Sequence, residues 1–168
     1  MGKRFCDERG TGDEICDFGQ WPASLEPFVV VQENIITTHR AGCARGLHYQ
    51  VEPHAQAKMV TVLRGSAQFF WVPLGQDLPT GQVHSIILTD TAASLYTPAN
   101  CAHGMLALAD ETQFLLKMSM PVSLEHRGEV NFRAKSLAID LALPLREDLI
   151  SQRDHDAPEW EMRRSSTR

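Results

Sequence analysis

Short apolar runs separated by turn signals fill most of the chain, and no other feature of the sequence constrains the fold as strongly. We expect strands at residues 28–31, 35–38, 47–51, 59–63, 66–72, 83–88, 94–97, 102–108 and 112–118, where β-branched and aromatic side chains are frequent. Pro73, Pro98 and the Asp110-Glu111 pair interrupt these runs at turn positions. Many short strands at regular spacing indicate an all-β sandwich or barrel. Helical signals occur only in the C-terminal third, around residues 144–150.

The composition is that of one ordinary globular domain. The chain has 168 residues, of which 43% are hydrophobic and 22% are charged, and this suits a single domain. We divide it into an N-terminal arm with strands at about residues 1–40, a barrel at about 28–140, a C-terminal segment at about 141–160 and a polar tail at 161–168.

Charge and cysteine usage narrow the partners and the compartment. The formal net charge of -5 argues against nucleic acid or an anionic membrane surface as the main partner. The four cysteines form no CxxC pair, and the sequence contains no signal-peptide pattern and no apolar run of membrane-spanning length. We therefore expect a cytoplasmic protein with reduced cysteines.

Chemistry-bearing residues gather in the stretch from Gly42 to Gly65. His48 and Gln50 lie two apart on one expected strand, so they share a face, and Lys58 begins the next strand. Arg45 precedes His48 in the same run. A base and two cations inside a small β-barrel are costly to bury unless they bind a ligand or pair with acids. Any one of these residues alone is more simply explained as an ordinary core or surface residue.

Four motifs, taken in order, resemble the dTDP-4-dehydrorhamnose 3,5-epimerase family over about residues 7–158. They are Arg45-Gly46-Leu47-His48-Tyr49-Gln50, Gln56-Ala57-Lys58-Met59-Val60, the stretch from Pro98 to Gly104, and Ser151-Gln152-Arg153-Asp154. In the third motif Asn100 stands where the family has glycine. The resemblance implies a cupin-type jelly-roll barrel with short C-terminal helical segments, acting without a cofactor on a nucleotide-diphosphate sugar that carries a 4-keto group.

The resemblance also assigns roles. His48 would be the base that removes the proton beside the ketone, oriented by Asp154, and Lys58 would stabilise the developing enolate oxygen. Contacts with the substrate would come from a second set of residues, namely Arg45, Gln50 and His103 for the sugar and phosphates, and Arg9, Glu14, Gln32 and Asn34 for the nucleotide. The family further implies a homodimer in which the N-terminal segment reaches the partner's site.

The sequence departs from the family where a second catalytic group would stand. The family places an acidic Tyr on the strand after the His-Gly motif, and the matching position here is Leu116. A nucleotide-binding aromatic further on is replaced around Pro121-Val122, and another is replaced by Gly12. We therefore expect proton removal to be preserved, and epimerisation to be confined to one centre or otherwise altered in outcome.

Two other functions are compatible with the same residues. A metal-dependent cupin enzyme could use His39, His48, His54 and His103 as ligands. The usual His-x-His pair is absent, and Lys58 would put a cation beside the metal, so we predict no bound metal. A binding protein that has kept the pocket and lost turnover would fit the loss of the Tyr at Leu116.

Overall fold

The structure is a computed structural model that describes residues 3–74, 82–90 and 93–159. The strands are β1 (Arg4–Asp7), β2 (Gly10–Asp13), β3 (Gln32–Thr38), β4 (Ala44–Gln50), β5 (Lys58–Arg64), β6 (Ser66–Pro73), β7 (His84–Thr89), β8 (Ser94–Thr97), β9 (Cys101–Ala107), β10 (Thr112–Met118) and β11 (Arg127–Glu129). Short helical turns occur at η1 (Phe18–Gln20), η2 (Glu147–Leu149) and α1 (Gln152–His155). The predicted all-β class with short C-terminal helical segments is confirmed.

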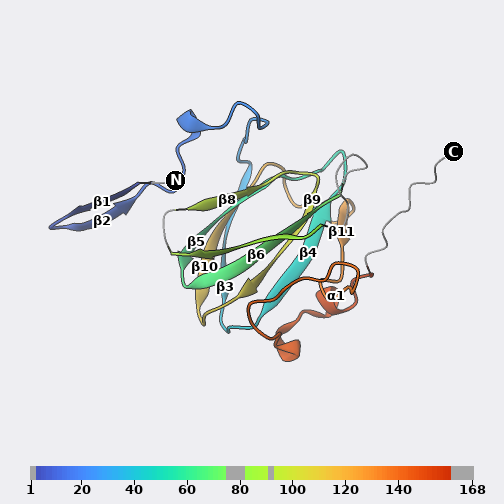
Figure 1. Cartoon of the computed structure of the whole chain (residues 1–168). Coiled ribbons are helices and arrows are strands. Elements are labelled where there is room, and N and C mark those ends of the chain that lie inside the picture. The colour runs from blue at the N-terminus through green and yellow to red at the C-terminus, as the bar shows by residue number, and fades with distance from the viewer. Residues whose placement is uncertain (1–2, 75–81, 91–92, 160–168) are drawn as a thin grey trace.

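Two antiparallel sheets pack face to face and form the body of the jelly roll (Figure 1). One has four strands in the order β3-β10-β5-β8, and the other has five in the order β11-β4-β9-β6-β7. Side chains of both sheets meet between them: Phe69 of β6 packs edge to face against Phe114 of β10, with ring centroids 5.6 Å apart. Val60, Val62 and Met105 belong to the same buried cluster. The interior between the sheets is therefore partly filled by apolar side chains from both walls.

The outer face of the five-stranded sheet is covered by the C-terminal segment. Phe70 and Leu106, which point away from the interior, are buried with Val130, Phe132 and Leu137 of that segment. Alternate residues of a strand point to opposite faces of the sheet, so these side chains lie on the outer face. Without the C-terminal segment they would be exposed to water. The C-terminal segment thus completes the core and brings α1 against β4.

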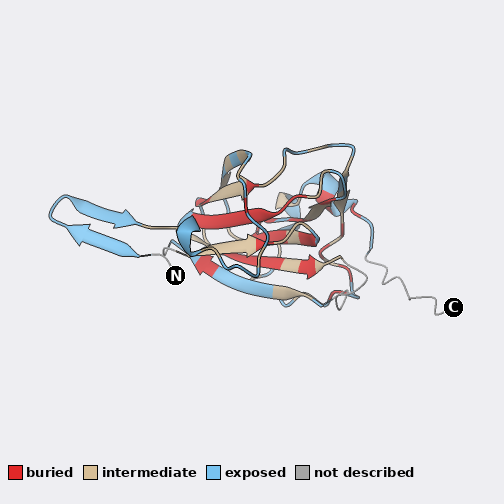
Figure 2. Cartoon of the chain, turned by 90° about the horizontal axis from the view of Figure 1, so that it is seen from above, coloured by how far each residue is buried: buried red, intermediate tan, exposed pale blue. Residues whose placement is uncertain are grey.

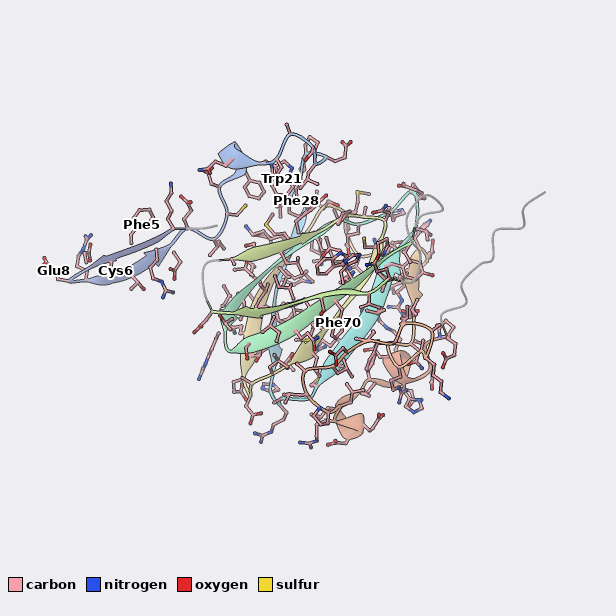
Figure 3. All side chains as sticks on the ribbon, in the orientation of Figure 1. Phe5, Cys6, Glu8, Trp21, Phe28 and Phe70 are labelled. Atoms are coloured by element: carbon pink, nitrogen blue, oxygen red, sulfur yellow. The ribbon has the colours of Figure 1, made fainter. Side chains whose placement is uncertain are left out.

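The N-terminal region forms a hairpin and an aromatic anchor. The β1–β2 hairpin stands off the sheets and all of its residues are exposed (Figure 2). Figure 3 shows Phe5, Cys6 and Glu8 on this hairpin, and shows Trp21 and Phe28 together above the barrel. Trp21 lies 6.0 Å from Phe28 and 5.0 Å from Tyr96 of β8, measured between ring centroids. The aromatic contacts fix the chain after the hairpin, whereas the hairpin itself contacts no sheet closely.

Several boundaries differ from those expected. The hairpin was not predicted, because its glycine-rich sequence lacks the apolar alternation of a half-buried strand. β3 begins at Gln32 and not at Phe28, which is buried in the aromatic anchor. The turn expected at residues 144–150 is the short 3-10 turn η2. The polar tail predicted at residues 161–168 lies outside the described residues, as do residues 75–81 between the strands expected at 66–72 and 83–88. In the described part of the chain no helix is long and apolar enough to cross a membrane.

Candidate active site

A cavity of about 460 Å³ opens between the two sheets, and its lining divides into a polar and an apolar part. The polar side chains are Arg45, His48, Lys58, Thr97, His103, Ser151, Arg153 and Asp154. The apolar side chains are Ile36, Val60, Phe69, Leu95, Met105, Phe114 and Leu116. A mainly apolar cavity with a few convergent polar groups is the usual form of a small-molecule site.

Strand register arranges the polar part in two facing rows. Across the five-stranded sheet, paired positions run in the order Glu129, His48, His103, Trp71, His84. Across the four-stranded sheet, the corresponding row is Gln32, Met118, Lys58, Thr97. Residues paired across neighbouring strands share a face. His48 and His103 therefore project into the cavity from one sheet, and Lys58 projects into it from the other.

Two glycines set the position of His48. β4 and β9 shift register between Arg45 and His48, so that His48 pairs with His103. Gly46 adopts φ +107°, and a Cβ there would lie 2.6 Å from the His103 carbonyl oxygen. A Cβ on Gly104 would lie 2.7 Å from the Arg45 carbonyl oxygen. The glycines of the Arg-Gly-Leu-His and His-Gly motifs thus allow the close approach of these strands.

His48 and Asp154 form a close pair. His48 Nε2 lies 2.6 Å from Asp154 Oδ1, and the Asp154 side chain is buried. Ser151 caps α1 by accepting a hydrogen bond from the Asp154 backbone N–H, which fixes the carboxylate beside β4. Burial acts to raise the pKa of Asp154, but its hydrogen bond and charge interaction with His48 outweigh this and lower the pKa. Asp154 is therefore an ionised acceptor that can orient the imidazole.

Lys58 and His103 form the second pair. Lys58 Nζ lies 2.5 Å from His103 Nε2, and only 9% of Lys58 is exposed. Among the described residues no carboxylate lies within ion-pair distance of Lys58. Burial, together with the positive charge of Arg153, lowers the pKa of Lys58 to about 7. Burial and the neighbouring Lys58 lower the pKa of His103, so His103 is neutral and its ring nitrogen can accept a hydrogen bond from the ammonium.

Arg153 is a site residue that the sequence reasoning did not assign. Its Nη2 lies 2.6 Å from His48 Nε2, and its Nε lies 3.2 Å from Glu129 Oε1. Arg153 and Asp154 therefore approach the same ring nitrogen, which can bond only one of them at a time. The signal was present in the sequence, because Arg153 directly precedes Asp154 in the Ser-Gln-Arg-Asp motif.

Three predicted binding residues occupy different surroundings. Arg45 and His103 line the cavity, whereas Gln50 is not among the lining residues. The Gln50 amide donates to the carbonyl oxygens of His54 and Pro121, and its oxygen accepts from the Ser123 N–H. These bonds join the loops that follow β4 and β10. The structure thus places Gln50 where it holds these loops together, and its contact with the substrate stays a prediction.

The four predicted nucleotide-binding residues lie outside the cavity lining. Arg9 is on the hairpin and pairs with Asp7 at 2.6 Å, and the Glu14 N–H donates to the Lys3 carbonyl. Gln32 and Asn34 are on β3, where register pairs Asn34 with Leu116. Within one copy of the chain, the structure therefore does not bring Arg9 or Glu14 to His48.

Leu116 belongs to the apolar wall one layer below Lys58. Register places it in a row with Asn34, Val60 and Leu95, immediately below the row that contains Lys58. No described side chain of the four-stranded sheet that lines the cavity, other than Lys58, can release a proton near neutral pH. The described residues also contain no group of three or more His, Cys, Asp or Glu side chains arranged to hold a metal ion. The absence of a bound metal stays a prediction.

Comparison with known proteins gives one consistent result. The family model for dTDP-4-dehydrorhamnose 3,5-epimerase matches residues 2–162. An enzyme of that description from Sinorhizobium fredii is 28% identical over 158 residues, covering 93% of this chain and 80% of its own. The Bacillus anthracis dTDP-4-dehydrorhamnose 3,5-epimerase, solved with TDP and PPi bound, has a TM-score of 0.85 and 30% identity, covering 95% of this chain and 91% of its own. ChmJ, a 3'-monoepimerase from Streptomyces bikiniensis solved with dTDP-quinovose, has a TM-score of 0.83 and 25% identity over 94% of this chain and 80% of its own.

Proposed function

The chain belongs to the dTDP-4-dehydrorhamnose 3,5-epimerase family, and from this premise we propose that it inverts a single carbon beside the ketone of a nucleotide-linked 4-keto-6-deoxy sugar. The observation that carries the proposal is the His48–Asp154 pair, 2.6 Å apart, at the wall of a cavity large enough for a sugar. The proton beside a ketone is the one that an imidazole base can remove, provided the resulting negative charge is stabilised.

The polar residues divide the work of such a reaction. Asp154 accepts a hydrogen bond from His48, holds one tautomer and stabilises the imidazolium that forms when His48 takes the proton. Lys58, facing His48 from the other sheet, supplies positive charge to the enolate oxygen. Arg45 is exposed at the cavity edge and suits a pyrophosphate, since its planar guanidinium bonds two oxygens at once.

Leu116 is the reason for proposing one centre and not two. A leucine has no proton to give, so this position cannot return a proton to the opposite face of the ring as a tyrosine would, and inversion depends on another donor. The similarity to a 3'-monoepimerase supports a fold of this kind carrying out inversion at one carbon. The alternative hypothesis is that the protein has lost catalytic turnover, as Leu116 in place of a tyrosine would allow, and only binds a nucleotide sugar.

Heavy-water exchange tests the proposal. The protein is incubated with dTDP-4-dehydro-6-deoxyglucose in heavy water, and deuterium is followed by proton NMR at both carbons beside the ketone. We expect incorporation with inversion at one carbon only. Incorporation with inversion at both would contradict the single-centre proposal. Binding without any exchange would support the non-catalytic reading.

We also propose that the protein works as a homodimer in which the exposed β1–β2 hairpin reaches the partner's cavity. Arg9 and Glu14 lie on or next to a hairpin that stands away from their own barrel, so a nucleotide contact would have to be made in another copy. Light scattering coupled to size exclusion tests the assembly. A monomer that retains full activity would contradict it.

A further inference from the structure

We propose that Lys58 is the acid of this site: its ammonium delivers a proton to the substrate carbon on the face opposite His48, and His103 relays the proton that recharges it. The inference rests on the proposed function and deepens it, because it names the second proton-transfer group. It goes beyond holding an enolate oxygen, since a fixed positive charge could do that without losing a proton.

His48 and Lys58 lie on opposite walls of the cavity. His48 enters the cavity from β4 of the five-stranded sheet, and Lys58 enters from β5 of the four-stranded sheet. Both line the same cavity. Inversion requires that one group removes a proton from one face of the carbon and another group returns a proton to the other face. Groups on opposing sheets of a sandwich meet that requirement for a ring bound between them.

Lys58 stands on the same wall as Leu116, the position where a tyrosine acid is missing. Leu116 pairs with Val60, and Lys58 lies two residues before Val60 on the same face of β5. Lys58 and Leu116 are therefore diagonal neighbours on adjacent strands, a separation of about 7–8 Å that long side chains bridge. The ammonium stands on the same wall as Leu116, where among the cavity-lining residues it is the one group able to release a proton near neutral pH.

The environment of the Lys58 ammonium is unusual. Lys58 is buried and contacts the neutral His103, and no carboxylate pairs with it among the described residues. A buried ammonium without a counter-ion loses its proton readily, and its pKa of about 7 agrees with that environment. His103 pairs with His48 in register and contacts Lys58 Nζ, so it is adjacent to both proton-transfer groups.

The step balances without any oxidant or reductant. The C–H bond beside the ketone breaks, its proton passes to the His48 ring and its electron pair becomes the enolate. An N–H bond of the Lys58 ammonium then breaks, a new C–H bond forms on the opposite face, and the carbonyl is restored. The site is left with a protonated His48 and a neutral Lys58 amine. Proton exchange with water and through His103 returns both groups to their starting states.

The Lys58→Arg variant distinguishes a role of Lys58 as proton donor from a role as fixed positive charge. Arginine keeps the positive charge and its hydrogen-bond donors but does not deprotonate in proteins. With dTDP-4-dehydro-6-deoxyglucose in heavy water, we expect K58R to exchange deuterium into the carbon with retained configuration, within about tenfold of the wild-type rate, while inversion falls about 100-fold or more. The matched control is Lys117→Arg, on the outer face of β10, where Lys117 pairs with Glu33. It should leave both rates unchanged.

Amine rescue provides a second measurement that does not depend on accommodating arginine. In Lys58→Ala, added ethylamine should restore inversion, and guanidine at the same concentration should not. Inversion by K58R above a tenth of the wild-type rate, equal loss of exchange and inversion in K58R, or rescue by guanidine as good as by ethylamine would each overturn the inference alone. A wild type that neither exchanges nor inverts would overturn the proposed function and this inference with it.

Discussion

The two walls of the cavity differ in how their polar groups are supported. On the five-stranded sheet, His48 has a carboxylate partner that is itself held by the Ser151 cap. On the four-stranded sheet, Lys58 has a neutral histidine as its partner, above a layer formed by Leu116, Val60 and Leu95. A base needs a fixed orientation and a counter-charge, whereas a buried ammonium without a counter-charge gives up its proton. The difference supports the proposal that the five-stranded wall supplies the base and the four-stranded wall supplies the acid.

Substitution of His48 or Asp154, the base pair of the five-stranded wall, should have the largest effect on proton exchange. His48→Ala should abolish exchange of the substrate proton with solvent, because His103, the other imidazole that lines the cavity, contacts Lys58 and pairs with no carboxylate among the described residues. Asp154→Asn should lower exchange by about 10²- to 10⁴-fold, since the imidazole loses its charge partner and its preferred tautomer. The measurement is deuterium uptake by proton NMR. Gln152→Ala, an exposed position two residues before Asp154, is the control, and wild-type exchange in D154N would contradict the assignment of the base.

The acid wall should be the next most sensitive. Lys58→Met should lower kcat about 100-fold with a much smaller change in KM, because the charge that Lys58 meets develops mainly in the transition state. Steady-state kinetics over a range of substrate concentrations separates the two constants. A raised KM with unchanged kcat would make Lys58 a plain binding residue and would remove the contrast between the walls.

Restoring a hydroxyl to the acid wall should produce a smaller gain. Leu116→Tyr should raise inversion several-fold, provided that the ring fits beside Val60 and Asn34 without overpacking. Leu116→Phe is the matched control, since it adds the ring without the proton. Equal inversion by the two variants would show that the hydroxyl is not used. The readout is the ratio of inverted to retained product.

The free energy of unfolding should depend on pH, because the Lys58 ammonium is buried without a described carboxylate partner. The folded pKa of Lys58, about 7, lies below its ordinary value of 10.5, so the unfolded chain binds more protons between these pH values and stability rises with pH across that window. Below pH 7 the charge is fully present in the folded protein. Lys58→Met should therefore stabilise the fold by on the order of 3 kcal/mol near pH 6, and the gain should disappear toward pH 10. Urea unfolding at several pH values measures this, and a gain that is independent of pH would contradict it.

Chelation should have no effect. Lys58 lies against His103, so a divalent cation bound there would meet a like charge. Dialysis against a chelator should leave the exchange rate unchanged. Activity that is lost to a chelator and regained with one added metal ion would favour the hypothesis of a metal-dependent cupin enzyme. The polar side chains of both walls would then be interpreted as metal-binding groups.

Local sequence patterns predicted the fold class, and the four motifs predicted the candidate catalytic residues. Short β-rich runs between turn signals indicated an all-β sandwich or barrel, because strand alternation is a local property that the order of residues records. The motifs around His48, Lys58, His103 and Asp154 identified residues that the structure brings to one cavity. What local patterns missed was the hairpin, since Gly10 and Gly12 carry no apolar alternation.

Tertiary structure alone decided which neighbours these residues have. Asp154 lies 106 positions from His48 in sequence, and Arg153 reaches the same ring nitrogen only because α1 packs on β4. Gln50 shares a strand with His48 yet bonds to loop carbonyls, because the ends of β4 and β10 meet beside it. The environment of Lys58 depends equally on pairing across sheets: its burial, its contact with His103 and the absence of a described carboxylate come from strands far apart in the chain. Burial and distance between remote residues determine the pKa of a group, and the order of residues does not record either.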